Sequence, residues 1–173
     1  MSSRENQAGI FHCKHSSNGL RGRLALVTIG NTLRGDDGAA QAVCNVLRET
    51  VAARVCRFDL GTYTNLLPLC LAGHDAAIIL DAVATGGTPG SLTILDLTDP
   101  ARACSAGNIS ATHALSLADE LQIAGIAGCL PRKTLFFGIE VQDAGWGKGL
   151  SEALRSRLPD LAGELERLIE MCA

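Results

Sequence analysis

The sequence predicts a single doubly wound α/β domain, a three-layer sandwich in which a mostly parallel, twisted sheet of about five strands is flanked by helices. Apolar runs of strand length alternate with segments of helical period, which is typical of βαβ units. The chain has 173 residues, of which 47% are hydrophobic, enough to bury one sizeable core. Two separate domains would be cramped at this length.

The expected strands are the runs of strand length between the helical segments. We expect strands over residues 24–30, 55–60, 76–80, 91–97 and 133–139.

The segments between these strands have the spacing of amphipathic helices. Residues 38–51 repeat apolar side chains at the i, i+3 and i+4 positions, and residues 66–73 predict a shorter helix. A helix is expected after Ser110, with Ser110 or Thr112 as its cap. Residues 151–171 predict a closing helix, which Pro159 should interrupt or split.

The domain is expected to span residues 24–173, after a polar N-terminal extension over residues 1–23. This extension contains the sequence HCKH, with His12 and His15, whose side chains are typical metal ligands. We favour a partly ordered, exposed segment over a metal site there.

Composition excludes several classes of function. The net charge of −3, one Trp and one Tyr argue against nucleic-acid binding. No apolar stretch is long enough to cross a membrane, and the N-terminus lacks the apolar centre of a signal peptide. Seven scattered cysteines without a C-x-x-C pair suggest buried thiols in a reducing compartment, so we expect a cytoplasmic protein.

The sequence GNTLRGDDG follows the first expected strand directly. Gly30 and Gly35 permit a tight turn, and Asp36 and Asp37 then fall where a helix begins. Both aspartates could simply cap that helix. One carboxylate suffices for capping, however, so we interpret Asp36 as the helix-start residue and Asp37 as free to point into a crevice.

Asp81 ends the apolar strand expected over residues 76–80. It could merely anchor the glycine-rich turn that follows. In the common strand order two-one-three, the first and third strands are neighbours, so Asp37 and Asp81 should face each other where the winding of the sheet reverses. Two carboxylates repel each other unless a cation or a shared proton lies between them.

His113 is expected in the first turn of the helix after the fourth strand, near the same edge of the sheet. A lone histidine there is often a surface or capping residue. Together with Asp37 and Asp81, however, it would make a mixed oxygen and nitrogen set suited to zinc or nickel. His74 precedes the third strand and should lie at the opposite edge.

Motifs of other enzyme classes are missing. Thr28 stands where a dinucleotide fingerprint would need its first glycine, and no Walker loop or G-x-S-x-G elbow is present. Nucleotide binding and serine or cysteine protease chemistry are therefore disfavoured.

Four segments in order resemble the hydrogenase maturation endopeptidase family. They are GNTLRGDDG, ILDAV ending the third strand, SATHALSLADEL, and FFGIEVQDAGWGKGLSEAL. The resemblance covers roughly residues 24–170. The sequence departs from the family at Ala39 and Ala40, where another glycine is frequent, and at Val141, where proline is common.

This resemblance implies an aspartyl-type endopeptidase that removes the C-terminal extension of a nickel-iron hydrogenase large-subunit precursor after nickel insertion. Residue by residue, the family's metal-contacting and catalytic positions fall on Asp37, Asp81 and His113. The nickel is expected to arrive with the substrate, and zinc or cadmium to substitute for it in vitro.

Two other interpretations stay open at this point. The chain could be a non-catalytic chaperone of the nickel-loaded precursor, or a zinc-dependent hydrolase of small molecules on a related fold. We expect a monomer that meets its protein partner transiently.

Overall fold

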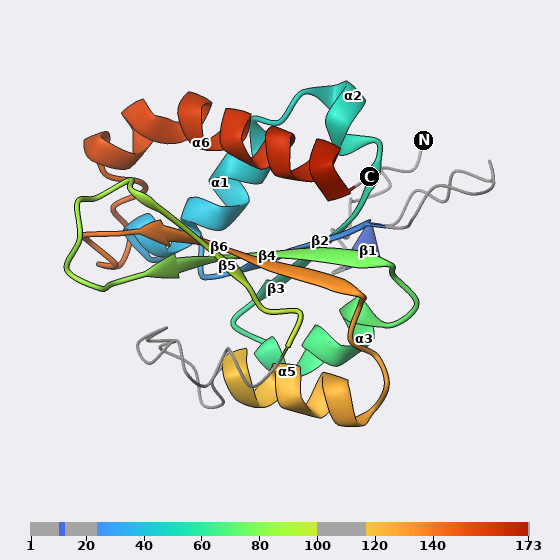
Figure 1. Cartoon of the computed structure of the whole chain (residues 1–173). Coiled ribbons are helices and arrows are strands. Elements are labelled where there is room, and N and C mark those ends of the chain that lie inside the picture. Colours follow the sequence, from blue (N-terminus) through green and yellow to red (C-terminus); the bar gives the residue numbers. More distant parts are fainter. Residues whose placement is uncertain (1–10, 13–23, 100–116, 173) are drawn as a thin grey trace, which may run out of the picture.

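The computed structural model describes residues 11–12, 24–99 and 117–172, and in this part the chain forms one six-stranded sheet between two layers of helices (Figure 1). The strand order is β1-β3-β2-β4-β6-β5. The predicted α/β sandwich is therefore confirmed.

All five expected strands are present. They are β2 (Leu24–Ile29), β3 (Val55–Gly61), β4 (Ala76–Val83), β5 (Leu92–Asp96) and β6 (Lys133–Glu140). The strands β3, β2, β4 and β6 are parallel, whereas β5 pairs with β6 in the antiparallel sense. Since β2 lies between β3 and β4, the predicted two-one-three order is correct, and the winding reverses at the β2–β4 pair.

A sixth strand was not predicted. β1 (Phe11–His12) belongs to the N-terminal segment and pairs antiparallel with β3, so that Phe11 lies opposite Phe58 and His12 opposite Arg57. Two residues are too short a run for any periodicity, so the sequence carried no signal for this strand.

The helices cover both faces of the sheet (Figure 1). One layer contains α1 (Ala39–Asn45), α2 (Glu49–Ala52) and α6 (Glu152–Cys172). The other contains the 3₁₀ turn η2 (Thr64–Leu66), α3 (Leu67–Leu71) and α5 (Leu117–Ile126). Along β2, Leu24 and Leu26 pack into the first layer and Ala25 and Val27 into the second, so the central strands are buried on both sides.

The helix predicted over residues 38–51 is broken. The 3₁₀ turn η1 (Gly35–Gly38) leads into α1, the chain leaves the helical path after Asn45, and α2 starts at Glu49. Arg48 has an extended backbone, with ψ at 136°. The carbonyls that α1 leaves open at its end are met by the Arg57 guanidinium, which donates to the carbonyls of Cys44 and Gln41.

Pro159 does not interrupt the last helix, so that prediction was wrong. α6 runs without a break from Glu152 to Cys172. Pro159 is exposed, so the carbonyl that loses its N–H partner faces water rather than the core. Leu154 and Leu161, on the buried face of the same helix, pack into the core and hold α6 against the sheet.

The helix predicted after Ser110 is described from Leu117 onward, as α5. Its expected caps, Ser110 and Thr112, lie outside the described residues. The short helix expected over residues 66–73 is confirmed as α3.

The loop after β2 depends on Gly30, whose φ is +126°. A Cβ atom added there would lie 2.0 Å from the carbonyl oxygen of Asp37. The amide N–H of Gly30 donates to the carbonyl of Gly61 at 2.8 Å, and its own carbonyl accepts from Gln41 Nε2 at 3.0 Å. The acidic turn can therefore fold back against the strand only with glycine at this position.

We predict that Gly30→Ala lowers the free energy of unfolding by on the order of 3 kcal/mol, because it combines backbone strain with a steric clash. Gly163→Ala is the matched control. Gly163 lies within α6, and a Cβ there meets nothing within 4 Å. This substitution should stabilise the protein by about 0.5–1 kcal/mol. Urea unfolding measures both, and equal effects of the two substitutions would contradict the steric account.

Candidate functional site

The candidate site lies at the edge of the sheet where the parallel strands β2, β4 and β6 have their carboxyl ends, at the left of Figure 1. Asp37 comes from η1, which follows β2, and Asp81 from the end of β4. Because β2 and β4 are neighbours, the fold brings these two predicted residues to the same place. The negative charge of Asp37 contributes to raising the pKa of Asp81, after burial.

Asp37 is only 7% exposed. Its Oδ2 accepts a hydrogen bond from the backbone N–H of Asn31 at 2.9 Å, which closes the turn on itself. Asn31 in turn accepts from the N–H of Leu33 through its side-chain oxygen. The turn thus holds the Asp37 carboxylate in one orientation by short-range bonds.

Asp81 is 3% exposed, and its Oδ1 accepts from the N–H of Ala82 at 2.8 Å. The pKa of this carboxyl group is raised to about 7: burial is the main cause, the charge of Asp37 adds to it, and the bond from Ala82 opposes it. Without a cation, Asp81 is therefore partly protonated near neutral pH.

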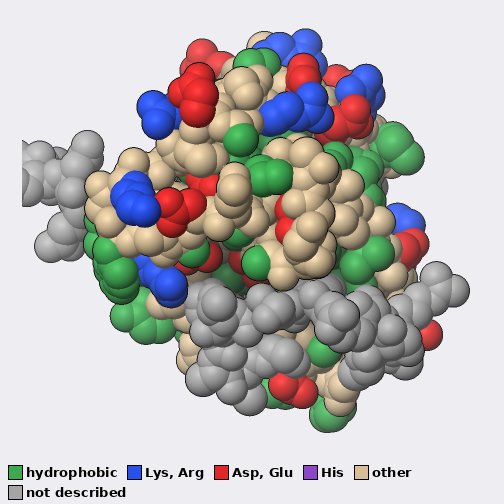
Figure 2. Space-filling model, turned by 90° about the vertical axis from the view of Figure 1, so that its left-hand side faces the viewer, with side chains coloured by type: hydrophobic (Ala, Val, Ile, Leu, Met, Phe, Trp, Pro, Cys, Tyr) green, Lys and Arg blue, Asp and Glu red, His purple; other side chains and the backbone are tan. Residues whose placement is uncertain are grey.

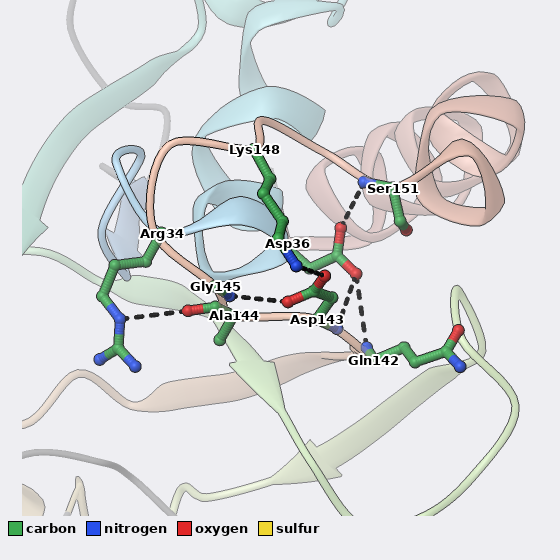
Figure 3. A network of polar contacts seen from close by, with 8 residues as sticks. All are labelled: Arg34, Asp36, Gln142, Asp143, Ala144, Gly145, Lys148 and Ser151. Carbon is green, nitrogen blue, oxygen red and sulfur yellow. Dashed lines mark hydrogen bonds and ion pairs between the residues drawn. The ribbon is translucent and has the colours of Figure 1, made fainter.

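Asp36 has a different function from the one predicted. Its side chain makes no capping bond to η1 or α1. It is fully buried and instead accepts three backbone N–H bonds from the β6–α6 loop (residues 141–151; Figure 3). The donors are Ser151 at 2.6 Å, Asp143 at 3.2 Å and Gln142 at 3.4 Å. The backbone N–H of Asp36 donates to the carbonyl of Asp143 at 2.8 Å, which completes the link.

The β6–α6 loop has further internal bonds (Figure 3). Asp143 accepts from the N–H of Gly145 at 2.8 Å and pairs with Lys148 at 2.9 Å. The side-chain bond from Lys148 holds the pKa of Asp143 below its usual range. The loop is therefore shaped by its own residues as well as by Asp36.

Glu140, at the end of β6, was missed by the sequence analysis. It is 4% exposed and accepts from the N–H groups of Thr85, Gly86 and Gly87 and from the Thr85 hydroxyl. Burial alone would raise the pKa of Glu140, but these hydrogen bonds outweigh it and hold the pKa below its usual range. Glu140 thus fixes the loop after Asp81. A carboxylate that ends an apolar strand was the signal used for Asp81, and it applied equally here.

His113, the third predicted metal ligand, lies outside the described residues. Within the described ranges, no group of three or more His, Cys, Asp or Glu residues is arranged to hold a metal ion. The described part of the chain therefore offers the two oxygen ligands Asp37 and Asp81. Carboxylate oxygens are common ligands of divalent cations.

Cys44 and Cys70 are disfavoured as nucleophiles. Burial raises the pKa of Cys44 to about 12 and that of Cys70 to about 11, so both stay as thiols near neutral pH. His74 packs edge-on against Phe58 before β4, at the edge opposite to the candidate site, as predicted.

We predict that Asp36→Ala lowers the free energy of unfolding by on the order of 3 kcal/mol, because it removes a fully buried carboxylate and leaves three backbone N–H donors without their acceptor. The amides of residues 142, 143 and 151 should then exchange hydrogen faster. Asp143→Ala removes a partly exposed carboxylate from the same loop and is the control. If Asp143→Ala lowers the free energy of unfolding as much as Asp36→Ala does, the structural function assigned to Asp36 is wrong.

The raised pKa of Asp81 predicts a pH-dependent stability for the protein kept metal-free with a chelator. An acid whose pKa is higher in the folded state stabilises the fold fully below about pH 4, and this contribution is lost as the pH rises to about 7. Between pH 4 and 8 the free energy of unfolding of the wild type should fall by on the order of 2–4 kcal/mol. That of Asp81→Asn should not show this fall. Superimposable profiles of unfolding free energy against pH would contradict the burial effect.

Comparison with known proteins identifies the family of the chain. The family model HycI, hydrogenase maturation protease, matches residues 42–168, a range that begins after the acidic turn and includes Asp81 and Glu140. The hydrogenase expression/formation protein HoxM of Azotobacter vinelandii is 30% identical over 151 residues, which cover 85% of this chain and 72% of HoxM. No helix in the described residues is long and apolar enough to cross a membrane.

Solved structures show the same fold. The hydrogenase maturating endopeptidase HybD of E. coli superimposes with a TM-score of 0.71 at 22% identity, over 86% of this chain and 93% of HybD. The [NiFe] hydrogenase maturation protease HycI of Thermococcus kodakarensis gives a TM-score of 0.63 at 24% identity, over 86% and 92% of the two chains. Because the family model matches well over half of the sequence, the chain belongs to the hydrogenase maturation protease family and is a peptidase.

Proposed function

We propose that this peptidase removes the C-terminal extension of a nickel-iron hydrogenase large-subunit precursor after nickel has been inserted. In this proposal Asp37, Asp81 and His113 contact the bound nickel. The observation that carries the proposal is the pairing of Asp37 and Asp81 at the β2–β4 switch point, in a chain of this family.

The two carboxylates are each held by one backbone bond. Asn31 donates to Oδ2 of Asp37, and Ala82 donates to Oδ1 of Asp81. Within the described residues the second oxygen of each side chain has no hydrogen-bond partner, so it can ligate a cation. This geometry supports recognition of a metal that the substrate already holds with its own ligands, since two or three oxygen and nitrogen atoms bind a free ion only modestly.

The pKa of Asp81 supports the same interpretation. Without a cation, the carboxyl group avoids its charge near Asp37 by retaining a proton. A divalent cation between the two side chains would displace that proton and favour both carboxylates in their charged form. A nickel-free precursor would supply no such charge, so the site would select for the loaded precursor.

Cleavage adds one water molecule across the scissile peptide bond and releases the extension as a free peptide. The contacts of Asp37, Asp81 and His113 to the nickel would hold that bond beside them, so that recognition of the metal and positioning of the bond are one event. Zinc or cadmium in the precursor should be recognised in vitro by the same ligands.

We also propose that the enzyme acts in the cytoplasm, as a monomer that meets its precursor transiently. Free thiols at Cys44, Cys70, Cys129 and Cys172 suit a reducing compartment.

The proposal predicts that purified enzyme cleaves the nickel-loaded precursor and leaves the nickel-free precursor intact, as measured by the mass of the released peptide. Asp37→Asn, Asp81→Asn and His113→Ala should each reduce the cleavage rate by on the order of 100-fold while retaining a cooperative thermal transition. The transition of Asp81→Asn should lie at or above that of the wild type at neutral pH, because the substitution removes a carboxylate whose charge burial disfavours. Asp96→Asn is the matched control, because Asp96 is a partly exposed carboxylate at the end of β5, which pairs with Lys133 at the other edge of the sheet.

Three outcomes would contradict the proposal. Equal cleavage of both precursor forms would exclude recognition of nickel. Binding without any loss of mass would favour a chaperone. Tight binding of zinc by the isolated protein, with hydrolysis of small amides, would favour a zinc hydrolase.

A further inference from the structure

Two large hydrophobic side chains lie exposed on loops beside the candidate site. Leu33, in the turn between β2 and η1, is 67% exposed, and Trp146, in the β6–α6 loop, is 68% exposed. Both loops are at the carboxyl edge of the sheet. Figure 2 shows this face, where hydrophobic side chains gather close to Lys and Arg side chains.

The two loops are fixed to each other by bonds between their backbones. The N–H of Gly147 donates to the carbonyl of Leu33 at 2.9 Å, and the N–H of Asp36 donates to the carbonyl of Asp143 at 2.8 Å. Arg34 Nε donates to the carbonyl of Ala144 at 3.3 Å (Figure 3). Leu33 and Trp146 are thus presented in a fixed arrangement, which lowers the entropic cost of binding a partner.

Arg34 adds a positive charge to these two side chains. Its guanidinium carbon lies 5.6 Å from the centre of the Trp146 ring, a cation–π contact. In the described part of the chain no carboxylate pairs with Arg34, and only its Nε donates a hydrogen bond. The terminal nitrogens can therefore receive a carboxylate in the bidentate geometry that arginine favours. Lys148, by contrast, is already paired with Asp143.

We propose that Leu33, Arg34 and Trp146 form a docking platform for the precursor protein, an inference that rests on the proposed function. The platform would receive a segment that carries a large apolar side chain and a neighbouring carboxylate. The apolar side chain packs on Leu33 and Trp146, and the carboxylate binds Arg34.

Continuity with the candidate site favours this occupant. Arg34 is followed directly by η1, which carries Asp36 and Asp37, so a polypeptide that reaches the carboxylate pair can contact the platform at the same time. Tryptophan and arginine are also the residue types that contribute most to binding energy at protein interfaces. A site with modest affinity for metal would gain from such a second contact.

Binding of the nickel-loaded precursor to inactive Asp37→Asn enzyme, measured by calorimetry, tests the platform apart from catalysis. Trp146→Ala and Leu33→Ser should each raise Kd by roughly 10-fold or more. Arg34→Ala should raise Kd and also weaken its dependence on salt, whereas Arg34→Lys should retain that dependence. Since Leu33 and Trp146 are exposed, their variants should melt like the parent protein. Arg34→Ala also loses the bond to Ala144, so its thermal transition is measured beside its Kd.

Ile126→Ser is the matched control. Ile126 is 89% exposed and ends α5 at the opposite edge of the sheet, so its substitution should leave Kd unchanged. In otherwise wild-type enzyme, the platform variants should raise KM for the loaded precursor and leave kcat close to the parent value.

The outcomes separate this inference from the proposed function. If the platform variants have the same Kd and KM as the parent, the inference that these three residues bind the precursor is wrong, even if cleavage occurs as proposed. Platform-dependent binding without cleavage would support the platform and overturn the hydrolytic proposal. If the variants change only the self-association of the enzyme, measured by light scattering, the surface binds a second copy and the inference is wrong.

Discussion

The geometry of the candidate site depends most on the hydrogen bonds that the buried carboxylate of Asp36 accepts. This carboxylate accepts N–H bonds from Gln142, Asp143 and Ser151, and so joins the turn after β2 to the loop after β6, more than 100 residues later in the chain. Its neighbour Asp37 is free for other chemistry because Asp36 fixes the turn in place. A single dipeptide thus combines a structural carboxylate with a candidate ligand. Because Asp36 and Asp37 are adjacent in one turn, the position of the Asp37 carboxylate depends on the bonds of Asp36.

A second buried carboxylate, at the end of β6, restrains the loop that follows β4. Glu140 holds residues 85–87 by their N–H groups, and these residues follow Asp81 closely. The two candidate ligands are therefore both flanked by loops that a buried acid restrains. Such restraint is needed where like charges converge, because a flexible loop would relax the repulsion between Asp37 and Asp81 by moving them apart.

The pairing of Asp37 with Asp81 could be predicted from the sequence because it follows from strand order, a rule that needs only the sequence of elements. The contacts of Asp36 could not be predicted, because its hydrogen-bond partners lie more than 100 residues away in the chain and no local pattern links them to it. Tertiary contacts override local propensity in two helices. The helix that breaks after Asn45 is met at its end by Arg57, and α6 continues through Pro159 because Leu154 and Leu161 are buried. Glu140 was overlooked although its pattern was legible, and His113 lies beyond the described residues.

Charge is distributed over the site in a way that suits a metal arriving with its protein. The centre holds two acids that repel each other and keep a proton, whereas the rim has Arg34 without a carboxylate partner in the described residues. In the proposed function, a metal-loaded polypeptide would satisfy both at once, because the cation would relieve the repulsion between the acids while a carboxylate on the polypeptide would neutralise Arg34. The selectivity that we propose for the loaded precursor would then come from the sum of two modest contacts, neither of which suffices alone.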